Sequence, residues 1–214
     1  MNYQGIIFDL DGTLVDTEPI HRDAWFKVMA EYDLEFGNEW FEQWIGKSDR
    51  VLAESLERYY KVPASADLLQ EKKRKTYHLM AAEFAAPFTG VEVLLGLLKD
   101  NFRMGIATNS SDKDAASVFQ KTKLDTFFQT IVTADMVDKL KPAPDMYLLA
   151  SKRLGLFTDV CLVVEDSPSG VKAAKEAGMY VLAVTNSHPE ESLKQADKIF
   201  TTSQDALQWI FDNH

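Results

Sequence analysis

Polar side chains that can do acid, base or nucleophilic chemistry follow several short apolar segments of the chain. The segments GIIFDL, FRMGIAT, TIVTA and VCLVVED are each followed, or ended, by such residues. The residues are Asp9, Asp11, Thr108, Asn109, Ser110, Lys141, Glu165 and Asp166. Segments that are apolar on both faces suit buried strands of a parallel sheet, whose carboxyl ends meet at one edge. We therefore expect these side chains to form a single site.

The residue types in this site are suited to phosphoryl transfer. Asp9 is the expected nucleophile, since a carboxylate that attacks a phosphoryl group forms an acyl phosphate and splits one difficult displacement into two easier ones. Asp11 would protonate the leaving oxygen and then take a proton from the incoming water. Lys141, Thr108 and Asn109 would bind the oxygens of the transferring group.

A hard cation is expected at the same place, because two anions do not approach each other unaided. Asp9, Asp166 and Glu165, with a backbone carbonyl near Asp11, supply the oxygen ligands that Mg²⁺ prefers. The sequence thus predicts Mg²⁺ as the cofactor, held at these four residues. Gly12 lets the backbone approach closely.

Each piece of the site also has a purely structural explanation. The DGT segment is a common turn, and Thr108, or Glu165 with Asp166, could simply cap a helix. Lys141 lies in a proline-containing loop, where a solvated surface lysine is common. The joint occurrence of these residues, in order after successive apolar segments, favours catalysis.

The elements that must position the site alternate between strand and helix. Strands are expected over residues 5–10, 102–108, 130–134, 160–166 and 180–185. Helical patterns lie over residues 91–98, from Pro144 to Gly155, and from Ser167 to Gly178, with Asp166 or Ser167 as the cap of the last. The fold class is therefore α/β, a Rossmann-like parallel sheet flanked by helices.

One stretch breaks this alternation, because residues 16–87 contain helical patterns and no convincing strand. Its aromatic residues are numerous enough for a small core of their own. We predict a small inserted α-helical cap domain over residues 16–87 and an α/β core over residues 1–15 and 88–214. Since α/β sheets bind ligands at the carboxyl ends of their strands, the cap would act as a lid.

Composition narrows the class of protein. The formal net charge of −10 over 214 residues works against binding to nucleic acid or an anionic membrane, since both need a basic surface. No apolar run approaches the length of a membrane span. We expect a cytoplasmic enzyme that acts on a small-molecule phosphate ester, with a monomer as the default state. The single cysteine, Cys161, lies in VCLVV and is expected to be a buried, inert strand residue.

The motifs DLDGTLVDT, ATNSS, KPAPDMY and VVEDSPSGVKAAKEAGM resemble those of the haloacid dehalogenase-like hydrolase superfamily, and the helical insert resembles its small cap. The resemblance covers essentially the whole chain. It implies Mg²⁺-dependent phosphoryl transfer through an aspartyl phosphate, with Asp9 as nucleophile, Asp11 as acid and base, and Asp166 on the metal. It places Thr108 and Lys141 on the phosphate. Carbon–halogen hydrolysis fits less well, because the dehalogenase branch does not use a second aspartate like Asp11.

Within the superfamily the chain is similar to β-phosphoglucomutase and to small sugar-phosphate phosphatases. We predict a phosphatase of sugar phosphates, such as fructose 1-phosphate or a hexose 6-phosphate. The alternative is a mutase, because Thr17 and His21 match residues that position the acid/base in that enzyme. Some phosphatases have a similar DTEP.HR.AW segment, so His21 does not separate a phosphatase from a mutase. His21 could also have no role in catalysis and simply lie at the border of the cap core.

The cap could carry a second phosphate site. In the segment GKSDR, Asp49 stands where the mutase has an arginine, and Arg50 is displaced by one residue, which rotates a helical side chain by roughly 100°. This weakens the case for such a site, although Lys47, Arg50 or Lys75 could still supply it. The EKKRK segment around Lys75 could equally be a solvated helical face.

A hypothesis from another class is a binding or regulatory protein that has lost catalysis. Its expected signature is a substitution at Asp9, Asp11, Lys141 or Asp166, and the sequence has none.

Overall fold

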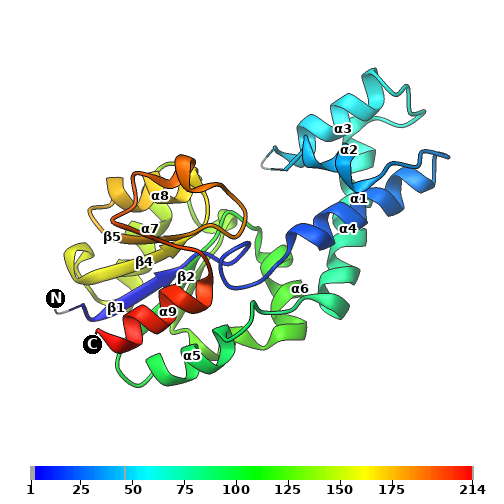
Figure 1. Cartoon of the computed structure of the whole chain (residues 1–214). Helices are drawn as coiled ribbons and strands as arrows, with labels where there is room; N and C mark the ends of the chain where they lie inside the picture. Colours follow the sequence, from blue (N-terminus) through cyan, green and yellow to red (C-terminus); the bar gives the residue numbers. More distant parts are fainter. Residues whose placement is uncertain (1–2, 46, 214) are drawn as a thin grey trace. The chain divides into compact units, whose positions relative to one another are not determined.

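The computed structural model describes residues 3–45 and 47–213 and divides into two compact units. One unit comprises Met1–Asp16 with Ala86–His214, and the other comprises Thr17–Ala85. The first is an α/β unit and the second is helical (Figure 1).

A parallel sheet of six strands forms the centre of the α/β unit, in the order β3-β2-β1-β4-β5-β6. Its strands are β1 (Gly5–Phe8), β2 (Arg103–Ala107), β3 (Thr130–Val132), β4 (Cys161–Glu165), β5 (Tyr180–Val184) and β6 (Lys198–Phe200). The predicted fold class is confirmed. Five strands were expected, and β6 was missed because its three residues, KIF, are too few to show a period.

Helices cover both faces of this sheet, as crossover connections between parallel strands require. The helices of this unit are α5 (Val91–Leu98), α6 (Asp112–Thr122), α7 (Asp145–Leu154), α8 (Pro168–Glu176) and α9 (Ser203–Asp212). Helices α5 and α9 pack together on one face, and α7 and α8 pack together on the other (Figure 1). Short 3-10 turns occupy Leu124–Phe127, Ala134–Met136, Thr158–Val160 and Glu190–Leu193.

The core between the sheet and α7–α8 follows from the alternation of side chains along each strand. Ile7, Val163 and Val181 point from successive strands toward Met146 and Val171 of the two helices, and all five are buried. Cys161 belongs to this cluster, so its predicted buried strand position is confirmed. Its thiol donates to the carbonyl oxygen of Phe157 at 3.3 Å, and burial raises the pKa of the thiol to about 11.

The helical unit contains α1 (Glu18–Ala30), α2 (Asn38–Glu42), α3 (Asp49–Arg58) and α4 (Ala66–Phe84). Helix α4 packs against both α1 and α3. Trp25, Phe41, Leu56 and Leu69 bring one large apolar side chain from each helix into a common core. The unit thus buries a core of its own.

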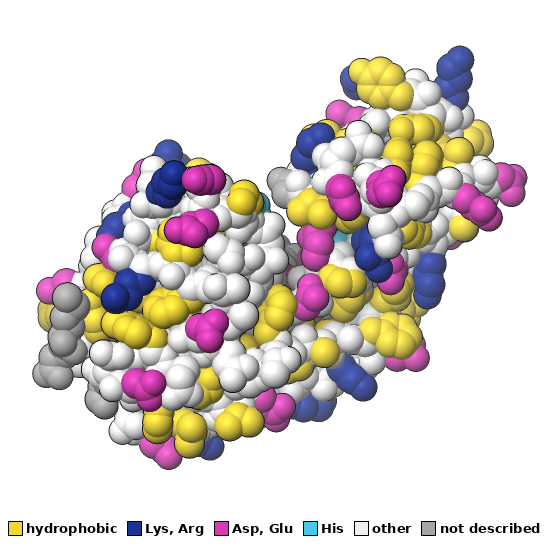
Figure 2. Space-filling view, viewed as in Figure 1, with side chains coloured by type: hydrophobic (Ala, Val, Ile, Leu, Met, Phe, Trp, Pro, Cys, Tyr) yellow, Lys and Arg dark blue, Asp and Glu magenta, His cyan; other side chains and the backbone are white. Residues whose placement is uncertain are grey.

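Charged side chains of both signs are interspersed on the face of the molecule in Figure 2. Across residues 3–45 and 47–213, no helix combines the length and the apolar character needed to span a lipid bilayer.

Candidate active site

The end of β1 leads into a tight turn that fixes Asp9 and Asp11. The Asp9 amide donates to the carbonyl oxygen of Val164 on β4 at 3.0 Å, which continues the strand pairing by one residue. The Gly12 amide then donates to the carbonyl oxygen of Val15 at 2.8 Å. Gly12 has a φ of +76°, and a Cβ there would lie 2.2 Å from Oδ2 of Asp166. Glycine is therefore needed both for the backbone conformation and for the close approach of Asp166.

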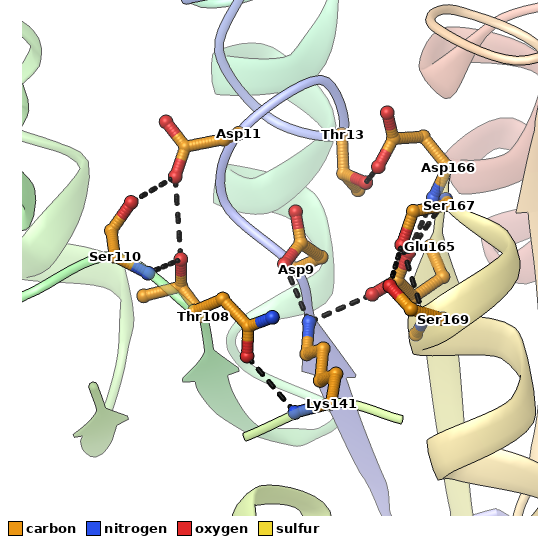
Figure 3. Close-up of polar contacts among 12 residues, drawn as sticks. Asp9, Asp11, Thr13, Thr108, Ser110, Lys141, Glu165, Asp166, Ser167 and Ser169 are labelled. Carbon is orange, nitrogen blue, oxygen red and sulfur yellow. Dashed lines mark hydrogen bonds and ion pairs between the residues drawn. The ribbon is translucent and has the colours of Figure 1, made fainter. Parts of the chain in front are cut away.

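Lys141 connects the two central strands of the site (Figure 3). Its Nζ donates to Oδ1 of Asp9 at 2.5 Å and to Oε1 of Glu165 at 2.7 Å. The Lys141 side chain is only 2% exposed. The other oxygen of Asp9 points away from Lys141, into the space between Asp11 and Thr13. The structure thus brings together the expected nucleophile, the expected cation and one of the expected acids.

Burial and charge shift the pKa values of this group in opposite directions. Burial raises the pKa of Asp9 well above its ordinary value, and the carboxylates of Glu165 and Asp166 raise it further against the opposing effect of Lys141. Burial also raises the pKa of Asp166, to about 7, with Glu165 adding to the effect. Burial would lower the pKa of Lys141, but the charges of Asp9 and Glu165 outweigh it and hold that pKa well above its usual range. Glu165 has a lowered pKa, because Lys141 and hydrogen bonds outweigh its burial.

Residues after β2 bind Asp11 (Figure 3). Oδ2 of Asp11 accepts hydrogen bonds from the Ser110 hydroxyl at 2.6 Å and the Thr108 hydroxyl at 3.3 Å. The amide of Ser110 donates to the Thr108 hydroxyl oxygen at 3.0 Å. Oδ1 of Asn109 accepts from the backbone amide of Lys141 at 3.1 Å, so the Asn109 side chain fastens the loop that carries the lysine.

The donor set at this edge fits a divalent cation in its charge. The carboxylates of Asp9, Asp11, Glu165 and Asp166 lie at this edge with the ammonium of Lys141. Burial raises the pKa values of Asp9 and Asp166, and the charge of neighbouring carboxylates adds to the effect. A hard cation that takes oxygen ligands would stabilise the ionised carboxylates. Asp9 and Asp166 are the side chains suited to hold one. Asp11 is bound to Ser110 and Thr108, and within residues 3–45 and 47–213 no three acidic, histidine or cysteine side chains stand at ligand spacing.

The predicted substrate-binding residues of the helical unit lie in three helices or directly before one. Thr17 is the buried residue that precedes α1, and its carbonyl oxygen accepts from the His21 amide at 3.0 Å. Arg50, in α3, forms ion pairs with Glu54 at 2.7 Å and with Asp67.

Lys75, in α4, is exposed and forms an ion pair with Glu71 at 2.6 Å. The expectation of a solvated face therefore holds for Lys75. It is wrong for its neighbour Lys73, whose side chain is only 2% exposed.

Lys73 is the centre of a polar cluster in the helical unit that sequence reasoning missed. Its ammonium contacts Nδ1 of His21 at 2.5 Å and Oδ2 of Asp49 at 2.6 Å. Oδ1 of Asp49 accepts from the indole nitrogen of Trp25 at 2.8 Å, and the His21 ring stacks on Tyr77. The available signal was the four-residue spacing of Leu69, Lys73, Tyr77 and Ala81, which places Lys73 on the buried stripe of α4.

Ser110 was expected at the end of the second strand without an assigned role, and its hydroxyl binds Asp11. Two other polar residues of the α/β unit escaped sequence reasoning. The first is Thr13, whose hydroxyl donates to Oδ1 of Asp166 at 3.3 Å. The Asn186 side chain, after β5, donates to the carbonyl oxygen of Gly12 at 2.8 Å and so fastens the β1 turn. Asn186 follows the predicted strand YVLAVT, and the rule that located the other residues would have found it there.

Comparison with known proteins agrees with this geometry. The family model described as haloacid dehalogenase-like hydrolase matches residues 6–184. Fructose-1-phosphate phosphatase YqaB of Escherichia coli is 32% identical over 177 residues, which cover 83% of this chain and 94% of that protein. The beta-phosphoglucomutase of Bacillus subtilis is 29% identical over 195 residues, which cover 87% of this chain and 85% of that protein.

A solved structure from Thermotoga maritima matches with a TM-score of 0.88 at 26% identity, over 98% of this chain and 99% of that one. Together with the phosphatase among the relatives, these matches support a phosphoric monoester hydrolase. The family model covers most of the sequence and includes every predicted residue of the strand-end site. The chain belongs to the haloacid dehalogenase-like hydrolase family.

Proposed function

We propose that this chain is a Mg²⁺-dependent phosphatase of small phosphorylated sugars that works through an aspartyl phosphate on Asp9. The observation that carries the proposal is the position of Lys141, whose ammonium lies 2.5 Å from Asp9 and 2.7 Å from Glu165 in a buried site at the ends of β1 and β4. A buried ammonium beside a carboxylate that has one oxygen directed away from it is suited to attract a phosphate ester to that carboxylate.

In the first step, the oxygen of Asp9 that points away from Lys141 forms a bond to phosphorus as the bond from phosphorus to the sugar oxygen breaks. Asp11 gives its proton to the departing oxygen. Lys141 and the Thr108 hydroxyl stabilise the charge that develops on the phosphoryl oxygens. Water then attacks the aspartyl phosphate, Asp11 takes its proton, and phosphate leaves with Asp9 restored.

Mg²⁺, held by Asp9 and Asp166 with a backbone carbonyl near Asp11, would neutralise charge on both the nucleophile and the phosphoryl oxygens. Its presence also answers an electrostatic need of this chain. Burial and neighbouring carboxylates raise the pKa of Asp9, and a nucleophile has to be ionised. The proposal of a bound cation therefore rests on the electrostatics of these residues as well as on the family.

The substrate class rests on the relatives. A fructose-1-phosphate phosphatase and a beta-phosphoglucomutase both match over more than four fifths of this chain. The names of both relatives refer to a phosphorylated sugar, and on this ground sugar phosphates are the favoured substrates. We propose that residues 16–87 act as the cap that selects among them, and that the enzyme works in the cytoplasm as a monomer.

Charge pairing in the helical unit favours a phosphatase over a mutase. A mutase has to bind a second phosphate, and Lys47, Arg50 and Lys75 were the candidates for that task. Two of the three already have acidic partners: Arg50 contacts Glu54 and Asp67, and Lys75 contacts Glu71. The ammonium of Lys47 lies over the Trp44 ring, 4.9 Å from its centre. An acid beside a cation offsets its attraction for a second phosphate, even though such exposed pairs contribute only about 0.2–1 kcal/mol to stability.

A panel of hexose, pentose and smaller phosphates tests the activity. Wild-type protein with Mg²⁺ should release inorganic phosphate from at least one sugar phosphate, and Asp9→Asn should not. Asp16→Asn is the matched control, because Asp16 is an exposed acid in the same loop. Turnover by Asp9→Asn at the wild-type rate would remove the proposal.

β-Glucose 1-phosphate with a trace of the 1,6-bisphosphate separates phosphatase from mutase. A phosphatase releases free phosphate. Formation of glucose 6-phosphate without free phosphate would establish the mutase instead, a reading that Thr17 and the contact of His21 with Lys73 keep open.

A further inference from the structure

Glu165 was expected to be a metal ligand, but its hydrogen bonds indicate a different role. Its Oε2 accepts from the amide of Asp166 at 2.8 Å and from the amide and hydroxyl of Ser167 at 2.8 and 3.0 Å. Its Oε1 accepts from Lys141 at 2.7 Å and from the hydroxyl of Tyr147 at 3.0 Å. A carboxylate has about four lone-pair directions, so five donors saturate it. Glu165 therefore cannot bind a cation directly without giving up one of these bonds.

Tyr147 lies in the first turn of α7 and is fully buried. Its ring belongs to the apolar cluster between the sheet and α7–α8, and the ring centre lies 5.0 Å from Nζ of Lys141. A phenylalanine would provide the same packing and the same ring face toward the ammonium. The hydroxyl is the additional feature, and a buried hydroxyl is costly unless it is hydrogen-bonded. Here the bond goes to the same oxygen of Glu165 that binds Lys141.

The shared oxygen couples Tyr147 to the reacting carboxylate. The ammonium of Lys141 pairs with both Asp9 Oδ1 and Glu165 Oε1. An increase in the negative charge at Oε1 would therefore draw the ammonium away from Asp9 and toward Glu165. The Tyr147 hydroxyl offsets part of that negative charge. In a buried site such electrostatic differences are larger than in water.

We propose that Tyr147 is a positioning residue: its hydroxyl shares Oε1 of Glu165 with Lys141 and thereby keeps the lysine ammonium on Asp9 and the transferring phosphoryl group. The inference rests on the proposed function. Tyr147 touches neither Asp9 nor the phosphoryl group, so its effect is on the rate of the chemical step rather than on substrate binding.

Tyr147→Phe removes one oxygen atom and keeps the ring. With a sugar phosphate that the wild type hydrolyses in Mg²⁺, kcat should fall about tenfold, the effect of one lost hydrogen bond to a charged group, while KM stays within about twofold. Tyr180→Phe is the matched control. Tyr180 lies in the same unit at the start of β5, at the edge of the sheet opposite the site, and its variant should keep both constants.

A merely structural role for the hydroxyl would lower the midpoint of thermal unfolding but leave kcat unchanged in the folded enzyme. That result, or a kcat within twofold of wild type, would overturn the inference and leave the proposed function intact. If Tyr147→Phe does not fold, 3-fluorotyrosine at position 147 supplies the test with a stronger hydroxyl donor: kcat above the wild-type value is expected, and an unchanged or lower kcat would overturn the inference. A wild-type protein that releases no phosphate would instead remove the proposed function and this inference with it.

Discussion

Gly170, in the first turn of α8, lies directly against the carboxylate of Glu165. A Cβ at position 170 would lie 1.5 Å from Oε1 and 1.9 Å from the carboxyl carbon of Glu165. The end of a glutamate side chain usually moves aside at little cost. Here it is fully buried and held by five hydrogen bonds, so it has nowhere to move without breaking some of them.

The expected effect of Gly170→Ala is opposite to the usual one. Replacing glycine by alanine in a helix stabilises a protein by up to about 1 kcal/mol. Forced overpacking costs typically about 1–3 kcal/mol, and a lost hydrogen bond to a charged group about 1.5–3 kcal/mol. With the helix gain subtracted, we expect the free energy of unfolding to fall by about 1.5–5 kcal/mol. Phosphate release should fall as well, because Glu165 and Lys141 move together.

Gly96→Ala is the matched control in α5, where the nearest atom to an added Cβ is 4.0 Å away. This variant should gain up to about 1 kcal/mol. Urea denaturation followed by circular dichroism gives both free energies of unfolding, and initial rates of phosphate release give the activity. A Gly170→Ala protein that is as stable and as active as wild type would refute the fixed position of Glu165.

Three further predictions concern charge and the thiol. Lys141→Met leaves the buried carboxylates of Asp9 and Glu165 without their cation, so the free energy of unfolding measured by urea denaturation should fall by about 3–5 kcal/mol; an unchanged value would contradict the pairing. In protein freed of divalent cations, the pKa of Asp166 is about 7 in the folded state, against an ordinary value of 3.8. The folded state therefore binds a proton more tightly than the unfolded state, and the stability that this proton gives is lost as pH rises from about 4 to 7. The midpoint of thermal unfolding in EDTA should decline over that range less in Asp166→Asn than in wild type, and Mg²⁺ should restore it above pH 7; equal declines would count against the shift. Cys161, with a pKa of about 11, is only about 0.1% thiolate at pH 8, so a colorimetric thiol reagent should react with it only after unfolding.

The strand-end residues could be predicted from the sequence because the fold rule behind them is simple. Parallel strands direct their carboxyl ends to one edge, so Asp9, Thr108 and Glu165 had to come close once GIIFDL, FRMGIAT and VCLVVED were recognised as strands. The sheet confirms this through the pairing of β1 with both β2 and β4.

The division of labour within the site could not be predicted, because it depends on which atoms meet. Glu165 and Asp166 are adjacent acids of equal standing in the sequence. In the fold, Glu165 turns inward to Lys141 and Tyr147, whereas Asp166 contacts Thr13 beside Gly12. Tyr147 lies six residues after Lys141, on an apolar helical stripe that gives no indication of its hydroxyl bond.

In the helical unit, charge alone was a poor guide to burial. EKKRK has the composition of a solvated face, yet Lys73 is buried because it falls on the stripe that faces α1 and α3. Asp49 and His21 supply its partners, and they lie 24 and 52 residues away in the sequence. Contacts at such separations follow from the packing of the helices and not from any local pattern.

Transfer of the phosphoryl group to Asp9 is the central claim, and acid quenching during turnover tests it most directly. Wild-type enzyme is mixed with Mg²⁺ and a sugar phosphate that it hydrolyses, and the reaction is quenched within one turnover. The protein is digested, and the peptide masses are measured by mass spectrometry before and after hydroxylamine treatment. We predict a hydroxylamine-labile phosphoryl group on the peptide that contains Asp9. We also predict that Asp9→Asn lowers the rate of phosphate release by at least about 10³-fold and that Asp16→Asn does not. Asp9→Asn protein that releases phosphate within about tenfold of the wild-type rate would contradict the account.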